Sequence, residues 1–115
     1  MRDVSLAAGR LRHHVLLQRP VVTQDADGSM VTTWTDVANV WAEIAPSSGR
    51  EFIAAAAEQS EVKGRFTIRH RDDIDASWRV VYRGKWFGIL AVLPDPVSGL
   101  EYLSLPYSEG VRLDL

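Results

Sequence analysis

Three histidines, His13, His14 and His70, are the side chains in this sequence best suited to acid–base or metal chemistry. His13 and His14 are adjacent, and adjacent side chains of a strand point to opposite faces, so the pair cannot hold one metal ion. His13 shares its face with Val15 and Leu17, which favours a partly buried, hydrogen-bonded histidine over a metal ligand. A hydrolase that uses His13 or His70 is therefore the weakest of the functions that we consider.

The acidic residues also offer little catalytic or metal-binding chemistry. The run from Asp25 to Gly28 is typical of the start of a calcium-binding loop, and Asp36 occupies the twelfth position of that loop. However, Asp36 replaces the usual glutamate and residues 30–35 have the composition of a strand, so a plain turn is favoured. Turn carboxylates exposed to solvent are also expected at Asp72, Asp73 and Asp75.

The motifs of nucleophilic catalysis and phosphate binding are missing from the sequence. It contains no G-x-S-x-G, no glycine-rich phosphate loop and no lysine-based catalytic motif. The lack of cysteine excludes disulfides, thiolate metal sites and cysteine nucleophiles, and it fits a reducing compartment. We therefore expect a protein without enzymatic activity, catalytic residues, metal or other cofactor.

Positive charge is concentrated in residues 62–71, which contain four basic residues and no acid. Alternation in a strand would put all four on one face, with Thr67 between them. The simpler interpretation is a solvated face that balances nearby acids, and the alternative is a surface that meets DNA, a channel or an acidic partner. The four candidates are Lys63, Arg65, Arg69 and Arg71, and the nearby acids are Glu58, Glu61, Asp72 and Asp73.

The chain's 115 residues fit one domain, residues 1–115, with no linker that would divide it. Its 46% of apolar and 24% of charged residues are ordinary for a soluble domain, and its net charge of −2 gives no overall basic field. No apolar run approaches the roughly 18 residues of a membrane span. We therefore expect no contact with a membrane.

Alternation and turn signals predict a mainly β fold, a small antiparallel barrel or sandwich of six or seven strands. Hairpins are expected at Asp27-Gly28 and at Arg83-Gly84-Lys85. Residues 1–9 and 106–115 are expected to be mobile arms. The predicted strands are residues 11–22, 30–37, 40–44, 62–71, 78–82, 86–93 and 100–105.

One short α-helix is predicted between two strands, within residues 46–61. Ser48 and Glu51 form a capping box, Pro46 prevents extension towards the N-terminus, and the alanines at 54–57 favour helix. About twelve residues are marginal for an isolated helix, and its apolar stripe is narrow. We therefore expect a helix that forms readily but depends on a neighbour for its position. The stripe consists of Phe52, Ile53, Ala56 and, less strongly, Gln59 or Ser60.

The sequence has four tryptophans, more than a core of this size requires. Aromatic residues are common anchors of protein–protein contacts, so Trp34 and Trp41 are candidate interface residues. At least two of the four tryptophans are expected in the core. The other two are Trp78 and Trp86.

An ordered set of segments resembles the head–tail joining family of long-tailed bacteriophages. No single segment is diagnostic, but their order is fairly specific, and the resemblance covers roughly residues 9–105. The segments are GRLRHHVLLQRP (9–20), WTDVANVWAEI (34–44), SGREF (48–52), RFTIR (65–69) and RVVYRGKWFGI (79–89).

The resemblance implies a head-closure (stopper) or adaptor protein of a phage or prophage. Such a β-barrel would assemble as a ring of six or twelve copies at the portal, retain packaged double-stranded DNA and dock tail-completion proteins. It would be made in the host cytoplasm and then become part of the virion. The resemblance also implies that the helical connection lies at an inter-subunit or channel-facing position, with candidates Arg50, Glu51, Phe52, Ile53 and Ala56.

The alternative function is a nucleic-acid-binding small barrel. In that case tryptophan and tyrosine side chains would stack on bases, and the basic residues 63–71 would follow the phosphates. Oligonucleotide affinity that falls steeply with salt would favour this alternative, and no binding at low salt would exclude it.

Overall fold

The computed structural model describes residues 8–46 and 62–113. A short 3-10 turn, η1 (Ala8–Arg10), precedes seven strands. The strands are β1 (His13–Gln24), β2 (Met30–Pro46), β3 (Gly64–Arg69), β4 (Arg79–Tyr82), β5 (Lys85–Ile89), β6 (Leu93–Pro94) and β7 (Tyr102–Arg112).

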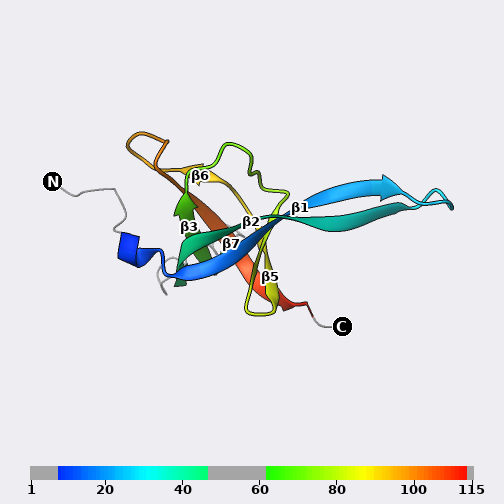
Figure 1. Cartoon of the computed structure of the whole chain (residues 1–115), viewed down its shortest axis with the longest axis horizontal. Coiled ribbons are helices and arrows are strands. Elements are labelled where there is room, and N and C mark those ends of the chain that lie inside the picture. Colours follow the sequence, from blue (N-terminus) through cyan, green and yellow to red (C-terminus); the bar gives the residue numbers. More distant parts are fainter. Residues whose placement is uncertain (1–7, 47–61, 114–115) are drawn as a thin grey trace.

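Six of these strands close into an antiparallel barrel (Figure 1). The strand order is β3-β2-β1-β4-β5-β7, and the pairing of β3 with β7 closes the circle, while β6 pairs with β7 outside it. The prediction of a mainly β fold is confirmed, with the barrel rather than the sandwich as its form. Each of the six strands is thus paired on both sides over at least part of its length.

The predicted helix lies outside the described residues. The same holds for its candidate residues, so their position between subunits or towards a channel stays a prediction. Within the described ranges the structure has no α-helix, and accordingly no helix there is long and apolar enough to cross a membrane. The candidates concerned are Arg50, Glu51, Phe52, Ile53 and Ala56.

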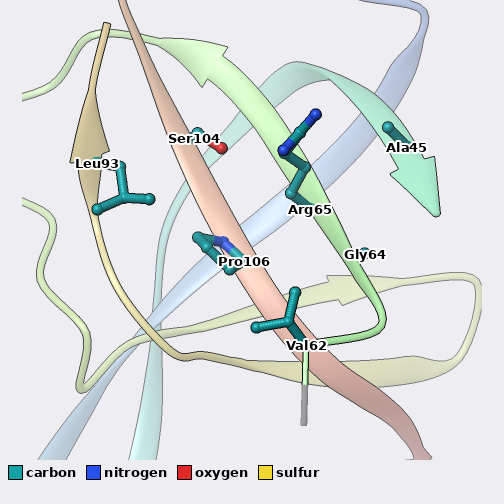
Figure 2. Close-up of a pocket in the computed structure, with 7 residues that line it drawn as sticks. All are labelled: Ala45, Val62, Gly64, Arg65, Leu93, Ser104 and Pro106. Atoms are coloured by element: carbon teal, nitrogen blue, oxygen red, sulfur yellow. The ribbon is translucent and has the colours of Figure 1, made fainter. Parts of the chain in front are cut away.

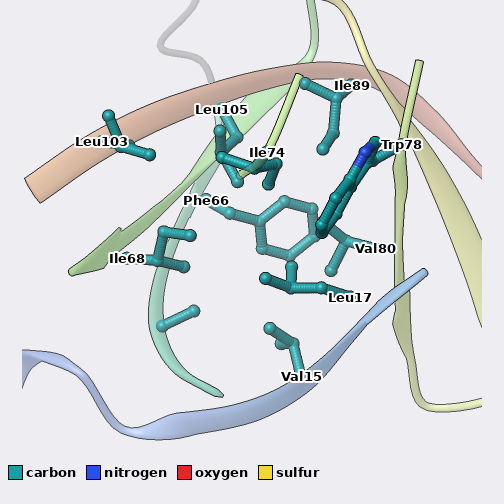
Figure 3. Packing of buried hydrophobic residues seen from close by; sticks show 11 residues of the cluster. Val15, Leu17, Phe66, Ile68, Ile74, Trp78, Val80, Ile89, Leu103 and Leu105 are labelled. Carbon is teal, nitrogen blue, oxygen red and sulfur yellow. The ribbon is translucent and has the colours of Figure 1, made fainter. Parts of the chain in front are cut away.

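Alternating side chains of the barrel strands point inwards and form one core (Figure 3). The Phe66 ring lies in the middle of this core, with Leu17 and Val80 beside it. The inward positions of β1 and β3 agree with the predicted alternation. The core consists of Val15, Leu17, Ala42, Phe66, Ile68, Ile74, Trp78, Val80, Ile89, Leu103 and Leu105.

Three rings pack together beside the core: Phe66, Phe87 and Tyr107. Their centroids lie 4.8–5.2 Å apart. A Cβ on Gly64 would overlap the Tyr107 phenol ring and approach the Ala45 carbonyl oxygen. Glycine at position 64 is therefore what allows the Tyr107 ring to lie against β3.

Both predicted hairpin turns are confirmed. In the first, the Asp25 carboxylate accepts hydrogen bonds from the backbone N–H groups of Asp27 and Ser29, each at 2.9 Å. In the second, Arg83 and Gly84 have φ of 51° and 75°, which is the left-handed conformation that a type I′ two-residue hairpin requires at both positions. Asp36 lies far from the first turn in the register, so the calcium loop is not formed.

One predicted break between strands is absent from the structure, and one predicted strand is divided. The predicted strands 30–37 and 40–44 are one continuous strand, β2, because an extra residue near Val37 is absorbed as a bulge opposite Leu17 and Gln18. The predicted strand 86–93 is divided into β5 and β6, since residues 90–92 between them are not in a strand.

The expectation of a mobile arm from residue 106 is wrong as far as Arg112. β7 continues to Arg112 and pairs with β3 and β5, so this segment closes the barrel. The strand tolerates Pro106 because of the direction in which the backbone of this residue points. The Pro106 carbonyl accepts a hydrogen bond from Leu90 N–H at 2.9 Å, so it faces the edge of β7 where the neighbouring strand changes from β6 to β5. The N–H that proline lacks would point to that same edge, so the β3 ladder loses no hydrogen bond.

Candidate interaction surfaces

A hairpin arm, residues 19–35, projects from the barrel (Figure 1). β1 pairs with β4 only up to Gln18 and β2 pairs with β3 only from Ala42, so within the described chain the arm strands pair only with each other. The arm helps to make the molecule 59 Å long but only 32 and 25 Å across. All its residues are described, and each is exposed or half-buried.

One face of the arm is mainly apolar, with Gln24 and Thr32 as its polar members. The register pairs Pro20 with Trp34, and the alternation of the strands puts Val22 and Met30 on the same face. Val22 is 56% exposed and Met30 is 66% exposed. A two-stranded ribbon has no further layer against which to bury these side chains, so they are accessible to a partner.

The tip of the arm is acidic. Residues 20–33 carry two charges, those of Asp25 and Asp27, and no lysine or arginine. Asp25 is engaged in holding the turn, whereas Asp27 contributes its backbone N–H to that turn. The Asp27 side chain is therefore the one that can be changed with least effect on the turn.

Arg79 of β4 anchors the base of the arm to the barrel. Its guanidinium lies over the Trp34 ring at 4.2 Å and the Trp86 ring at 5.3 Å, and its Nε donates to Gln18 Oε1 at 2.7 Å. Gln18 Nε2 in turn donates to Asp36 Oδ1 at 2.8 Å. Burial lowers the pKa of Arg79, but arginine titrates so far above neutrality that it stays a cation and keeps both cation–π contacts.

A cavity of about 280 Å³ lies at the opposite end of the β1–β2 ribbon. We call it the basic pocket; it is lined by Leu11, Val40, Trp41, Arg69, His70 and Arg71. Its walls thus combine apolar and aromatic surface with cationic groups. Such a lining suits a partner group that is itself apolar with a negative charge nearby.

The cationic groups of the basic pocket differ in their partners. Arg71 makes a bidentate ion pair with Asp73, with N···O distances of 3.0 and 2.8 Å. This pairing raises the pKa of Arg71 and lowers the pKa of Asp73. His70 Nε2 lies 2.8 Å from Asp72 Oδ1, while its Nδ1 is buried with no partner in the described part of the chain. Arg69 is exposed and, among the described residues, has no carboxylate partner.

A second cavity, of about 220 Å³, lies beside β3, β7 and β6 (Figure 2). Ser104 contributes a hydroxyl group to the lining of this cavity. None of the described lining residues is a histidine or a carboxylate that could activate that hydroxyl. The cavity is lined by Ala45, Val62, Gly64, Arg65, Leu93, Ser104 and Pro106.

The Asp95 carboxylate organises the loop between β6 and β7, a role that the sequence analysis missed. It is buried, and it accepts hydrogen bonds from the backbone N–H groups of Val97, Ser98, Gly99 and Glu101. These bonds, with that of Glu101 foremost, hold the pKa of Asp95 well below its usual range. The segment Asp-Pro-Val-Ser-Gly has the composition of an Asx turn, which could have signalled this loop.

The three histidines have different surroundings in the described part of the chain. His13 is half-buried and its Nδ1 lies 2.9 Å from the Tyr82 hydroxyl, as expected for a hydrogen-bonded histidine. His14 instead stacks on Trp41 outside the barrel. Within the described residues no three histidine, aspartate or glutamate side chains are grouped as metal ligands.

Comparison with known proteins identifies the family. A family model of phage head completion proteins matches residues 6–110. The chain belongs to the phage head completion protein family. It is 33% identical to head completion protein gp7 of Enterobacteria phage HK97 over 109 residues. This aligned region covers 93% of this chain and 90% of gp7. The chain is 29% identical over 92 residues to head completion protein gp16 of Bacillus phage SPP1, covering 78% and 82% of the two chains.

Solved structures share the fold of this head completion protein. Protein SF1141 of Shigella flexneri 2a superposes with a TM-score of 0.74 at 30% identity, over 92% of this chain and 98% of SF1141. A chain from the virion of a native gene transfer agent particle superposes with a TM-score of 0.65 at 23% identity, over 88% and 96% of the two chains. The predicted resemblance to a phage head–tail joining family is thus confirmed, and this family is structural rather than enzymatic.

The four basic candidates of this head completion protein do not form one continuous stripe. Arg65 and Arg69 are exposed on β3, Lys63 is exposed just before it, and Arg71 follows β3 in its ion pair with Asp73. Thr67, expected between them on the same outer face, is only 7% exposed. Arg65 belongs to the cavity of Figure 2, whereas Arg69 and Arg71 line the basic pocket.

The tryptophans are distributed differently from the expectation of at least two in the core. The core cluster contains Trp78, while Trp34 and Trp86 are half-buried against Arg79. Trp41 is 56% exposed and stacks on His14 with a centroid distance of 4.7 Å. Two of the rings, Trp34 and Trp86, thus pack on an arginine at the base of the arm. For the alternative function, a nucleic-acid-binding barrel, Trp41 is the exposed tryptophan that could stack on a base.

Proposed function

We propose that this head completion protein forms a ring at the portal vertex, where it joins the head to the tail and helps to retain packaged double-stranded DNA. The observation that carries this proposal is the hairpin arm, which exposes Val22 and Met30 although the core is complete without them. Exposed apolar side chains grouped on one projecting element are typical of protein–protein contacts. Membership of a head completion family supports particle proteins as the partners.

A ring of identical subunits requires two different surfaces on each copy, one that meets the other on the neighbouring copy. The arm and the basic pocket are two such surfaces. In a ring of six or twelve copies, Lys63, Arg65, Arg69 and Arg71 would be repeated around the axis, near neighbouring subunits or the DNA in the channel. The faces of the ring would contact the portal or adaptor protein above and the tail-completion proteins below.

Particles that lack the chain test this function directly. Filled heads without it are expected to lose DNA to added nuclease and to join no tails, and purified protein added back is expected to restore both properties. Electron microscopy of the restored particles should show a ring at the portal vertex, and mass spectrometry should find the chain in purified virions. Heads that keep their DNA and acquire tails without the chain would contradict the proposal.

A further inference from the structure

The two ends of the β1–β2 ribbon carry complementary surfaces. The arm end is acidic through Asp25 and Asp27 and exposes Met30. The other end holds the basic pocket, with Trp41 and Arg69 at its surface. Each chain therefore presents an acidic, apolar projection at one end and a basic, aromatic cavity at the other.

We propose that the hairpin arm of one copy docks in the basic pocket of the next copy. The acidic tip then faces Arg69, and Met30 enters the cavity. The contact joins two different surfaces of the same chain, which is the heterologous contact that a ring requires. This inference rests on the proposed function, because it assigns the contact by which the ring is built.

Charge favours this pairing over the pairing of like surfaces. Residues 20–33 contain acids and no base, so two arm tips repel each other. Arg69 lacks a carboxylate among the described residues, and an aspartate from a neighbouring copy would supply one. Complementary charge of this kind selects the partner and its orientation more than it raises the affinity.

Apolar surface supplies the remaining attraction. Trp41 is 56% exposed and Met30 is 66% exposed, and docking would remove both from water. Methionine is unbranched and flexible, so it adapts to an irregular cavity such as the one walled by Leu11 and Val40.

The arm cannot reach the pocket of its own chain. Met30 and Trp41 belong to the same strand, β2, and at about 3.3 Å per residue they lie roughly 36 Å apart. The partner must therefore be a second copy. Residues 19–35 are fewer than the roughly 20–30 residues that each side of a stable interface contributes, so one contact alone should be weak. Closing a ring, in which every copy uses both surfaces, would make the assembly stable.

Cysteine cross-linking in assembled particles tests the contact. The chain has no cysteine, so Ser29→Cys at the arm tip and Val40→Cys in the pocket wall introduce the only two thiols. Oxidation is expected to give covalent multimers of this double variant on non-reducing gels. The matched control combines Ser29→Cys with Lys85→Cys, an exposed position on β5, and should stay monomeric on the same gels.

The outcomes separate this inference from the proposed function. Particles that retain DNA and join tails, but show no more cross-linking than the control, would overturn the docking of the arm and leave the ring function standing. DNA retention without the chain would overturn the proposed function itself. Cross-links in the Ser29→Cys and Val40→Cys variant, absent from the control, would support the contact.

Charge reversal provides a second test that does not depend on disulfide geometry. Asp27→Lys and Arg69→Glu should each reduce the yield of completed particles about tenfold or more, since each sets like charges against each other. Combining both changes in one chain should restore the yield to within about twofold, because opposite charges meet again. Glu109→Lys and Lys85→Glu, exposed and outside both surfaces, are the controls and should have little effect. Failure of the combination to recover, with both single variants folded, would contradict the pairing.

Discussion

β1 and β2 each run from the barrel into the hairpin arm, and their side chains have different surroundings in the two regions. In the barrel half of β1, Val15 and Leu17 are almost fully buried among residues of five other strands and loops. In the arm half, Val22 is 56% exposed although it too is apolar. The change occurs near Gln18, where β1 loses β4 as a partner and the bulge in β2 shifts the register.

This difference separates residues that serve the fold from residues that serve a partner. A barrel residue is held by contacts within its own chain, so its replacement is felt as lost stability. An arm residue has few such contacts, so its replacement should change assembly and leave stability nearly the same. The following predictions test that separation, from the largest expected effect to the smallest.

Phe66→Ala should show the largest loss of stability. The ring fills the middle of the core, and its removal is expected to cost about 3–5 kcal/mol of the free energy of unfolding. Met30→Ala in the arm should change that free energy by no more than about 0.5 kcal/mol. Denaturant unfolding of both variants measures the contrast, and equal losses would remove the distinction between barrel and arm.

Gly64→Ala should be the next most harmful change. Its added Cβ would overlap the Tyr107 phenol ring, and overpacking of this kind costs about 1–3 kcal/mol. Gly9→Ala is the matched control, because an added Cβ there has no neighbour within 4 Å. A thermal unfolding midpoint that is the same for both variants would show that the Tyr107 contact does not require glycine.

Arg79→Leu should loosen the connection between arm and barrel. The variant loses two cation–π contacts and the bond to Gln18, and we expect a loss of about 1 kcal/mol. Amide hydrogen exchange should accelerate in residues 19–35 more than in β3 or β7. Arg19→Leu, an exposed change within the arm, is the control. Unchanged exchange in the arm of the Arg79→Leu variant would show that Arg79 does not anchor it.

Asp95→Asn should change mainly the pH dependence of the chain's stability. The folded-state pKa of Asp95 is depressed, so its contribution to stability is complete above the ordinary aspartate pKa of about 4 and is lost as the pH falls through the lowered value. The variant cannot ionise, so its disadvantage relative to the natural chain should shrink on acidification. Unfolding midpoints between about pH 7 and pH 2 measure this difference. A constant difference across that range would contradict the role of the carboxylate.

The barrel could largely be predicted from the sequence, because its inward positions alternate with polar ones. In β3, Phe66 and Ile68 alternate with Arg65, Thr67 and Arg69 and show this period clearly. The bulge near Val37 could not be predicted, because it depends on the opposite strand. The continuation of β7 past Pro106 was missed because proline usually ends a strand, and only the gap between β5 and β6 explains why it does not.

The interaction surfaces were only partly predictable. Local sequence identified Arg69, Arg71 and Trp41 as candidates, and the fold brings these three to one pocket. The packing of Trp34 and Trp86 on Arg79 joins residues from β2, β4 and β5, and no local pattern reveals such a contact. The exposure of the arm likewise follows from where β4 begins, opposite Gln18, rather than from the composition of the arm itself.

Replacement of residues 22–32 by Asn-Gly tests the separation of barrel and arm most directly. Asn-Gly closes a two-residue hairpin, so the shortened ribbon can still turn. The shortened chain is expected to fold with an unfolding free energy within about 1 kcal/mol of the full chain, and to fail to complete heads. A shortened chain that unfolds, or one that completes heads as well as the full chain, would contradict the account.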